Sequence, residues 1–237
     1  MLPVSLAALL TFLAAPAMAA PKVPEPSECR MFGKLGCYYL PSSLDGRRNS
    51  RVLVYLRGHH PSWGGTVPEN QREESARRAF AGFELGRIAE EERVALFVTA
   101  SSHLAVSPKD LKAVADSLGM VFDGVVLAAH SGGYAGLTAS LPSFEAVDQI
   151  VMLDNFYFGE GLTRLIKAKT DAGAACAGFY TSFKYGKDKK GNKVRYEESF
   201  KPLIGPAACP VEQRDDYGHN AGVNRCLGPY LHRQPCR

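Results

Sequence analysis

Short apolar runs alternate along the chain with segments whose apolar residues recur every three or four positions. The runs predict buried strands, because a strand covered on both faces is apolar on both sides. They cover residues 36–40, 51–56, 94–99, 125–127, 146–153, 174–181 and 209–213. Strands that alternate with helices predict an α/β fold with a mostly parallel central sheet and helices on both faces.

Several segments between these runs predict helices. Residues 70–92 carry apolar side chains near a helical period, which predicts one long amphipathic helix. These side chains are Ala76, Phe80, Phe83 and Ile88. Ser107 and Pro108 predict the start of another helix, because serine caps a helix and proline fits its first turn. Residues 161–169 and a segment that runs toward Tyr230 predict two more.

The first 20 residues, MLPVSLAALLTFLAAPAMAA, are apolar and end in small residues. Ala17-Met18-Ala19 fits the cleavage site of a secretory signal peptide. Pro3 and Pro16 leave an apolar stretch shorter than the roughly 18 residues that span a membrane. We therefore expect a secreted or periplasmic protein that is not stably inserted in a membrane. Residues 21–237 suffice for a single domain with a large core.

Six cysteines, an even number, predict three disulfides in an oxidising compartment. Six cysteines allow many pairings. Short separations favour Cys29 with Cys37 and Cys226 with Cys236, which leaves Cys176 for Cys209. Zinc is the alternative use of cysteine, but the chain contains no C-x-x-C pair. We therefore expect disulfides and no metal site.

The net charge of +4 is mild, and much of the excess lies in residues 184–195, KYGKDKKGNKVR. This segment lacks apolar periodicity and contains two glycines, which favours a solvated loop. Contact with a polyanion or a membrane surface is the alternative. We expect no nucleic-acid partner.

Residues 124–137 read GVVLAAHSGGYAGL and predict a buried strand, a very tight turn and a helix. Ser131 at such a turn is held clear of both elements. We expect a side chain at Gly132 or Gly133 to collide with the neighbouring strand or helix. The N–H of Gly132, at a helix N-terminus, faces a position that favours developing negative charge.

Polar residues follow the ends of other predicted strands. Residues 51–56 run into Arg57-Gly58-His59, residues 146–153 end in Asp154, and His219 follows the last strand. The carboxyl ends of parallel strands meet at one edge of a sheet, where we expect these groups to converge. A neutral imidazole can take the proton of a serine hydroxyl, and a carboxylate can orient that imidazole. We therefore predict that Ser131 is a nucleophile, His219 its base and Asp154 the orienting acid.

Other residues could fill two of these roles. The alternatives to the predicted base are His103 and His232, and those to the predicted acid are Asp188, Asp215 and Asp216. His130, next to the predicted nucleophile, is interpreted as a packing residue. The pair His59-His60 is interpreted as loop structure and not as a metal-binding pair.

The segment Ala129-His130-Ser131-Gly132-Gly133 has the form small-X-Ser-X-small, and the order Ser, Asp, His runs along the chain. Both features resemble the α/β-hydrolase family, in particular its compact serine esterases and lipases. The resemblance implies an oxyanion hole formed by the N–H groups of Gly132 and of the residue after an early His-Gly dipeptide. Arg57-Gly58 stands at that dipeptide here, so His59 is the matching residue. Ala129 replaces the usual first glycine, and Asp154 comes one strand earlier than in most members.

The resemblance implies a secreted serine hydrolase with little or no lid, which needs no metal or organic cofactor. A carboxylic ester hydrolase that forms an acyl-enzyme is the first expectation, with a small-molecule or polymeric ester as substrate. A peptidase or amidase on the same triad and a catalytically silent binding protein are the alternatives. Phe156, Tyr157 and Tyr134 are candidate pocket residues, although the aromatics after Asp154 could instead pack the sheet edge. A monomer is expected.

Overall fold

The computed structural model of the chain describes residues 23–59, 61–62, 65–156, 159–181 and 200–236. The predicted signal peptide, the whole of the basic segment 184–195 with Asp188, His60 and Tyr157 lie outside the described residues. Within the described ranges, no helix combines the length and the apolar character that crossing a membrane requires.

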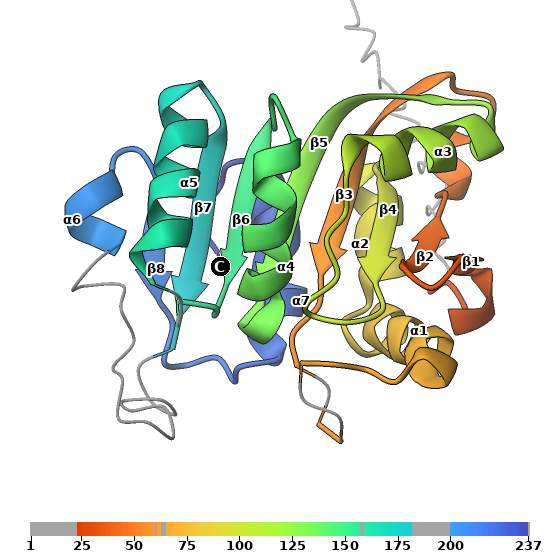
Figure 1. Cartoon of the computed structure of the whole chain (residues 1–237), viewed down its shortest axis with the longest axis horizontal. Coiled ribbons are helices and arrows are strands. Elements are labelled where there is room, and N and C mark those ends of the chain that lie inside the picture. The colour runs from red at the N-terminus through yellow and green to blue at the C-terminus, as the bar shows by residue number, and fades with distance from the viewer. Residues whose placement is uncertain (1–22, 60, 63–64, 157–158, 182–199, 237) are drawn as a thin grey trace, which may run out of the picture.

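Eight strands of the described chain form one sheet in the order β1-β2-β4-β3-β5-β6-β7-β8 (Figure 1). Their bounds are β1 Arg30–Phe32, β2 Gly36–Tyr39, β3 Asn49–Leu56, β4 Ala95–Thr99, β5 Val121–His130, β6 Gln149–Leu153, β7 Ala175–Tyr180 and β8 Val211–Gln213. The β1–β2 and β2–β4 pairs are antiparallel, and all pairs from β4 to β8 are parallel. The predicted mostly parallel α/β sheet is confirmed.

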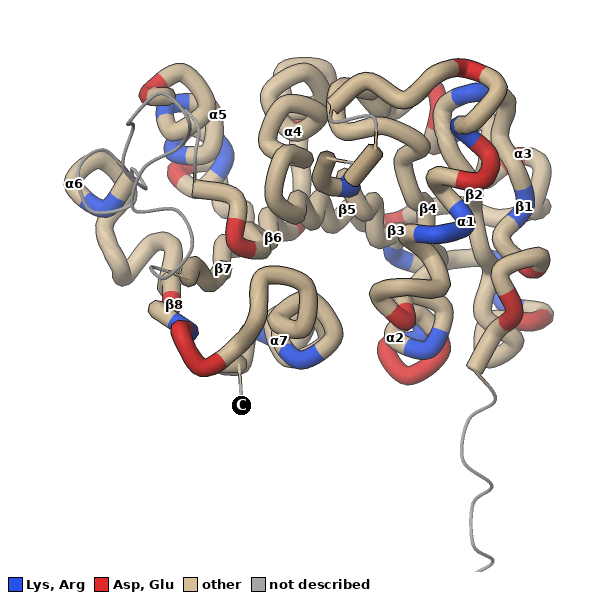
Figure 2. The backbone as a smooth tube through the Cα atoms, turned by 90° about the horizontal axis from the view of Figure 1, so that it is seen from below, with Lys and Arg blue, Asp and Glu red and all other residues tan. Residues whose placement is uncertain are grey.

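Helices cover both faces of this sheet (Figure 2). One face carries α1 (Arg72–Gly82), α2 (Leu85–Glu92) and α7 (Ala221–Leu231), and the other carries α3 (Pro108–Leu118), α4 (Tyr134–Ser140) and α5 (Glu160–Asp171). The short α6 (Lys201–Ile204) lies beside α5. Alternate residues of β3 divide between the two cores: Leu53 and Tyr55 face α1, α2 and α7, whereas Val54 faces the opposite helices.

The start of α3 agrees with the sequence prediction. Ser107 is its N-cap, and the hydroxyl oxygen accepts the Asp110 N–H at 3.3 Å. The Asp110 carboxylate in turn accepts the Ser107 N–H at 2.9 Å. This reciprocal pair satisfies two backbone donors that a helix otherwise leaves without partners.

The prediction of one long helix over residues 70–92 was wrong. α1 ends at Gly82, and Glu84 has a φ of +48°, so the chain turns before α2 begins. The periodicity hid this break because apolar residues on both sides of it face the same core. The turn brings the ring of Phe83 to 5.0 Å from that of His130, centroid to centroid.

The first predicted strand, residues 36–40, is the second in the structure. β1 precedes it as an antiparallel edge strand. Its three residues, Arg30–Phe32, are partly exposed and begin with a charge, so they form no apolar run in the sequence. The disulfide Cys29–Cys37 ties β1 to β2, and Cys176–Cys209 and Cys226–Cys236 are also formed. The predicted pairing of the cysteines is confirmed.

The glycines after Ser131 permit two different close contacts. A Cβ on Gly133 would overlap the carbonyl oxygen of Leu56, so the start of α4 packs directly on the end of β3. A Cβ on Gly132 would instead overlap the imidazole of His59. The expected collision with a strand is therefore correct for Gly133, whereas the neighbour of Gly132 is a loop side chain.

We expect Gly133→Ala to lower the free energy of unfolding by about 1 to 3 kcal/mol, because the methyl group must displace the backbone of β3. Gly161→Ala is the matched control, since a Cβ there meets no atom within 4 Å inside α5. The control should be neutral or stabilising by up to about 1 kcal/mol. Urea denaturation of both variants measures the difference. Equal stabilities would contradict the close packing of Gly133 on Leu56 of β3.

Candidate active site

Ser131 occupies a strained turn at the carboxyl end of the central strand β5. Its φ is +51°, in the left-handed region that a residue with a Cβ seldom adopts. β5 ends at His130 and α4 begins at Tyr134, so only three residues connect the strand to the helix. Such strain persists only where the surroundings hold it, and here the Gly133 contact with β3 does so.

The loop after β3 lies directly against this serine. A Cβ built on Gly58 would be 2.8 Å from the Cβ of Ser131 and 3.1 Å from the carbonyl oxygen of His130. Only glycine allows these two segments of the chain to approach so closely. The His59 ring lies against Gly132. The structure therefore brings together Ser131, Gly132 and the Gly58–His59 loop.

Asp154 and His219 meet at the same edge of the sheet. Asp154 follows β6, is 1% exposed and has a φ of +45°. Its Oδ2 lies 2.6 Å from Nδ1 of His219, which belongs to the loop between β8 and α7. Asp154 also accepts the N–H of Thr181 at 2.9 Å and the Thr181 hydroxyl at 2.7 Å. The carboxylate can therefore hold the imidazole with Nε2 on the opposite side of the ring.

His130 contacts His219 directly. Its Nε2 lies 3.2 Å from the His219 carbonyl oxygen, and the two ring centroids are 4.7 Å apart. A carbonyl can only accept, so His130 carries its proton on Nε2. Burial, and secondarily the charge of His219, lower the pKa of His130 to about 3. His130 is thus a packing residue, as predicted, but it also holds the backbone of His219.

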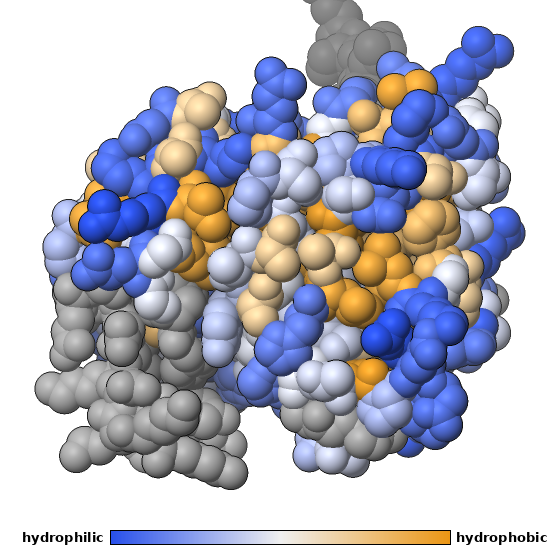
Figure 3. Space-filling model, viewed as in Figure 1, coloured by the Kyte–Doolittle hydropathy of each residue, from blue (hydrophilic) through white to orange (hydrophobic). Residues whose placement is uncertain are grey.

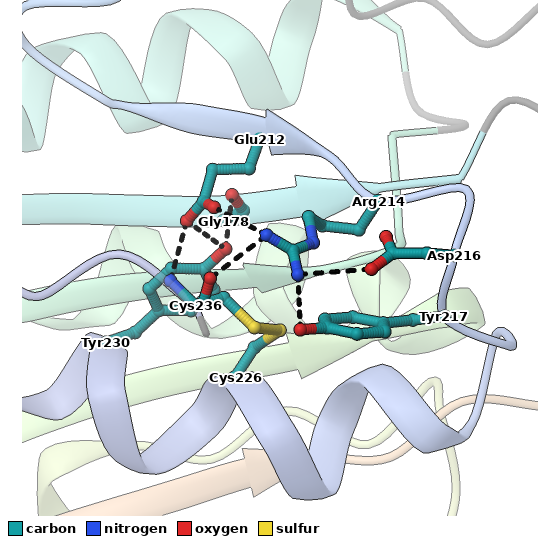
Figure 4. Close-up of a disulfide and its surroundings, with 8 residues drawn as sticks. All are labelled: Gly178, Glu212, Arg214, Asp216, Tyr217, Cys226, Tyr230 and Cys236. Atoms are coloured by element: carbon teal, nitrogen blue, oxygen red, sulfur yellow. Dashed lines mark hydrogen bonds and ion pairs between the residues drawn. A yellow bond between two sulfur atoms is a disulfide. The ribbon is translucent and has the colours of Figure 1, made fainter.

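The loop that carries His219 is anchored near the C-terminus of the chain (Figure 4). The Arg214 guanidinium donates to the Cys236 carbonyl at 3.1 Å and lies 4.2 Å from the centre of the Tyr217 ring. Glu212 accepts the Cys236 N–H at 2.8 Å, and the disulfide links Cys236 to Cys226 in α7. These contacts join β8, the loop and α7 on both sides of His219.

The other candidate acids and bases have different surroundings. His103 lies beside His59, with the ring centroids 6.0 Å apart, and His232 pairs with Glu92 of α2. Asp216 pairs with Arg214 at 3.3 Å.

The candidate pocket residues do not share one environment. Phe156 is 1% exposed, and its ring packs 5.1 Å from that of Phe200 and 6.3 Å from that of Tyr180. For Phe156, this burial favours the alternative in which the side chain packs the sheet edge. Tyr134 is half-buried at the first residue of α4.

Sequence reasoning did not identify Thr181. It is 4% exposed and immediately follows β7, the strand next to β6. A polar residue at the carboxyl end of an apolar strand was the available signal, because such a residue must find a partner when buried. Its partner is Asp154.

A cleft of about 400 Å³ opens elsewhere, between α3 and the start of β5. Apolar side chains, including Leu111, Phe122 and Val125, line it, and Figure 3 shows apolar surface beside α3 on this face. The cleft lies toward the amino end of β5, whereas Ser131 lies at the carboxyl end. Across the described part of the chain, no three His, Cys, Asp or Glu side chains gather as metal ligands would.

No protein-family model and no curated protein sequence matches the chain. Several solved structures do match the chain in fold. A thermostable esterase is 12% identical with a TM-score of 0.51, over 85% of this chain and 59% of the esterase. A truncated carbohydrate esterase from gut microbiota is 11% identical with a TM-score of 0.50, over 90% of this chain and 97% of the other. At such identities the likeness shows the fold alone.

The buried His130 should make folding stability depend on pH. The unfolded chain binds a proton at this imidazole near its ordinary pKa of 6.5, whereas the folded chain does so only near 3. The unfolded state therefore binds more protons between these values, and acid destabilises the fold. The free energy of unfolding should therefore fall as the pH falls from about 6 to about 4. We expect His130→Phe to reduce the slope of this decline by up to about 1.4 kcal/mol per pH unit.

Urea denaturation of the wild type and His130→Phe across this pH range measures the slopes. Phenylalanine keeps a ring against Phe83 and His219 but cannot take up the proton. Parallel stability curves for the two proteins would show that His130 titrates alike in the folded and unfolded chains.

Proposed function

Since the chain has the α/β-hydrolase fold, we propose that it is a serine hydrolase that cleaves carboxylic esters. The observation that carries this proposal is the 2.6 Å contact between His219 Nδ1 and the buried Asp154, at the edge of the sheet where Ser131 occupies its strained turn. A carboxylate, an imidazole and a serine at one edge supply the nucleophile, base and orienting group that acyl transfer needs.

In the proposed reaction, Ser131 Oγ attacks the ester carbonyl while His219 Nε2 takes the hydroxyl proton. Asp154 stabilises the imidazolium that forms. The tetrahedral oxyanion accepts hydrogen bonds from the N–H groups of His59 and Gly132. Its collapse expels the alcohol, which receives the proton from His219 and leaves an acyl-enzyme. Water then attacks the acyl group, again with His219 as base, and releases the acid and Ser131.

Two further observations support parts of this proposal. The structural neighbours are named as esterases, which supports an ester over an amide as substrate. The three disulfides support an extracellular or periplasmic location, and with it the assignment of residues 1–20 as a signal peptide and 21–237 as the mature domain.

We expect a fluorophosphonate probe to label the folded protein at Ser131, because the probe reacts with serines that a neighbouring base activates. Ser131→Ala should abolish labelling and lower kcat/KM for p-nitrophenyl esters by about 10⁴-fold or more. Ser143→Ala, a substitution in the 3-10 turn after α4, is the control and should label normally.

Persistent labelling of Ser131→Ala, or no labelling of the folded wild type, would refute the proposal. Matched p-nitrophenyl ester and p-nitroanilide substrates then decide the leaving group. Faster turnover of the ester supports an esterase, and faster turnover of the anilide would assign the same triad to an amidase.

Thr181 should affect turnover through Asp154. We expect Thr181→Val to lower kcat about 10-fold, because loss of one hydrogen bond to a charged group costs about 1.5 kcal/mol. Thr181→Ser keeps the hydroxyl and should restore most of the rate. Steady-state kinetics of the two variants measure this, and equal activity of the valine variant and the wild type would exclude the role.

A further inference from the structure

Arg57 is a buried arginine at the base of the Gly58–His59 loop. It immediately follows β3 and is 6% exposed. Its Nε donates to the Gly58 carbonyl at 3.2 Å, and NH1 donates to the Ser75 carbonyl at 3.0 Å and to the Ser75 hydroxyl. Ser75 belongs to α1, and its hydroxyl donates onward to Ala100 at 2.8 Å. The guanidinium therefore joins the loop to α1.

Every acceptor observed for this guanidinium is uncharged. Among the described residues, no Asp or Glu oxygen lies within 4.0 Å of it. Tyr55 is an ionisable neighbour that could supply a negative charge, but complete burial raises the pKa of its phenol, which stays neutral. Arginine keeps its proton throughout the neutral range. Buried charges are usually paired, so an arginine with uncharged acceptors requires another explanation.

The geometry of the peptide bond gives one. In a trans peptide the C=O of one residue and the N–H of the next point in opposite directions. The described chain contains no cis peptide. Arg57 Nε holds the Gly58 carbonyl, so the N–H of His59 points away from the guanidinium. The same peptide follows Gly58, which packs against Ser131.

We propose that Arg57 is a positioning residue for the oxyanion. It holds the Gly58–His59 peptide so that the His59 N–H faces the substrate carbonyl oxygen, and its positive charge behind the peptide strengthens that N–H as a donor. The inference rests on the proposed function. Arg57 stands where the resemblance leads one to expect histidine. In the proposed site this arginine orients the oxyanion donor.

The neighbouring histidines report the charge of Arg57. Burial, then the charge of His103, and then the charge of Arg57 lower the pKa of His59. Arg57→Met should therefore raise the His59 pKa, and Arg57→Lys, which keeps a cation, should raise it less. NMR titration of the imidazole measures this without any substrate.

The kinetic test compares a p-nitrophenyl ester with its thionoester, in which sulfur replaces the carbonyl oxygen. Sulfur accepts hydrogen bonds weakly, so the thionoester gains little from the oxyanion donors. We expect Arg57→Met to lower kcat/KM for the ester about 10- to 100-fold and to affect the thionoester much less. Arg57→Lys should lie between Arg57→Met and the wild type.

Arg87→Met is the matched control. Arg87 lies on α2 and pairs with Glu84 and Glu91. Its substitution should therefore leave kcat/KM for both substrates unchanged. Circular dichroism and thermal unfolding verify that each variant folds. Arg57→Gln, which removes the charge and keeps a polar side chain, replaces Arg57→Met if that variant does not fold.

Three outcomes separate the possibilities. Selective loss with the oxygen ester supports the inference. Equal losses with both esters, or no loss, would overturn it and leave the proposed function intact, because Arg57 would then only support the fold. Ester turnover by the wild type that persists in Ser131→Ala would overturn both.

Discussion

The close approach of β3 and β5 at their carboxyl ends is the constraint on which the candidate site depends. The two strands pair in parallel, with Leu56 opposite Ala129. The loops that follow them therefore leave the sheet side by side. Gly58 packs on Ser131, and Gly133 packs on Leu56, so each loop holds the other. This double contact maintains the left-handed backbone of Ser131 and sets the Gly58–His59 peptide beside it.

The buried polar groups around this contact follow the hydrogen-bonding rule for interiors. Asp154 is almost completely buried and accepts three hydrogen bonds, two from Thr181 and one from His219. Hydrogen bonds to both carboxylate oxygens offset the cost of removing the group from water. His130 instead avoids the cost of a buried charge, because burial lowers its pKa and the imidazole stays neutral. The site therefore combines one stabilised anion with one imidazole that cannot easily charge.

The sequence predicted what depends on strand order and strand ends. It predicted the sheet, and it predicted that Asp154 and His219 lie at one edge, because the carboxyl ends of parallel strands meet at the same edge. It could not reveal Thr181 as a partner, since that contact needs the pairing of β6 with β7, in which Leu153 lies opposite Phe179. The break at Glu84 was hidden because the apolar period continues in phase across it. The burial of Arg57 likewise depends on the position of α1, which no local pattern specifies.

The parts of the site differ in what holds them. Close packing at glycines places Ser131 beside the Gly58–His59 loop at the end of the sheet. His219 lies in a loop, and side chains hold it: Asp154 at the imidazole, His130 at the carbonyl. The anchor formed by Arg214, Glu212 and the C-terminal disulfide secures the same loop at a distance. A loop without such cross-links samples many conformations. Oxidation of the last two cysteines therefore contributes to the precision with which the proposed base is held, although neither cysteine touches it.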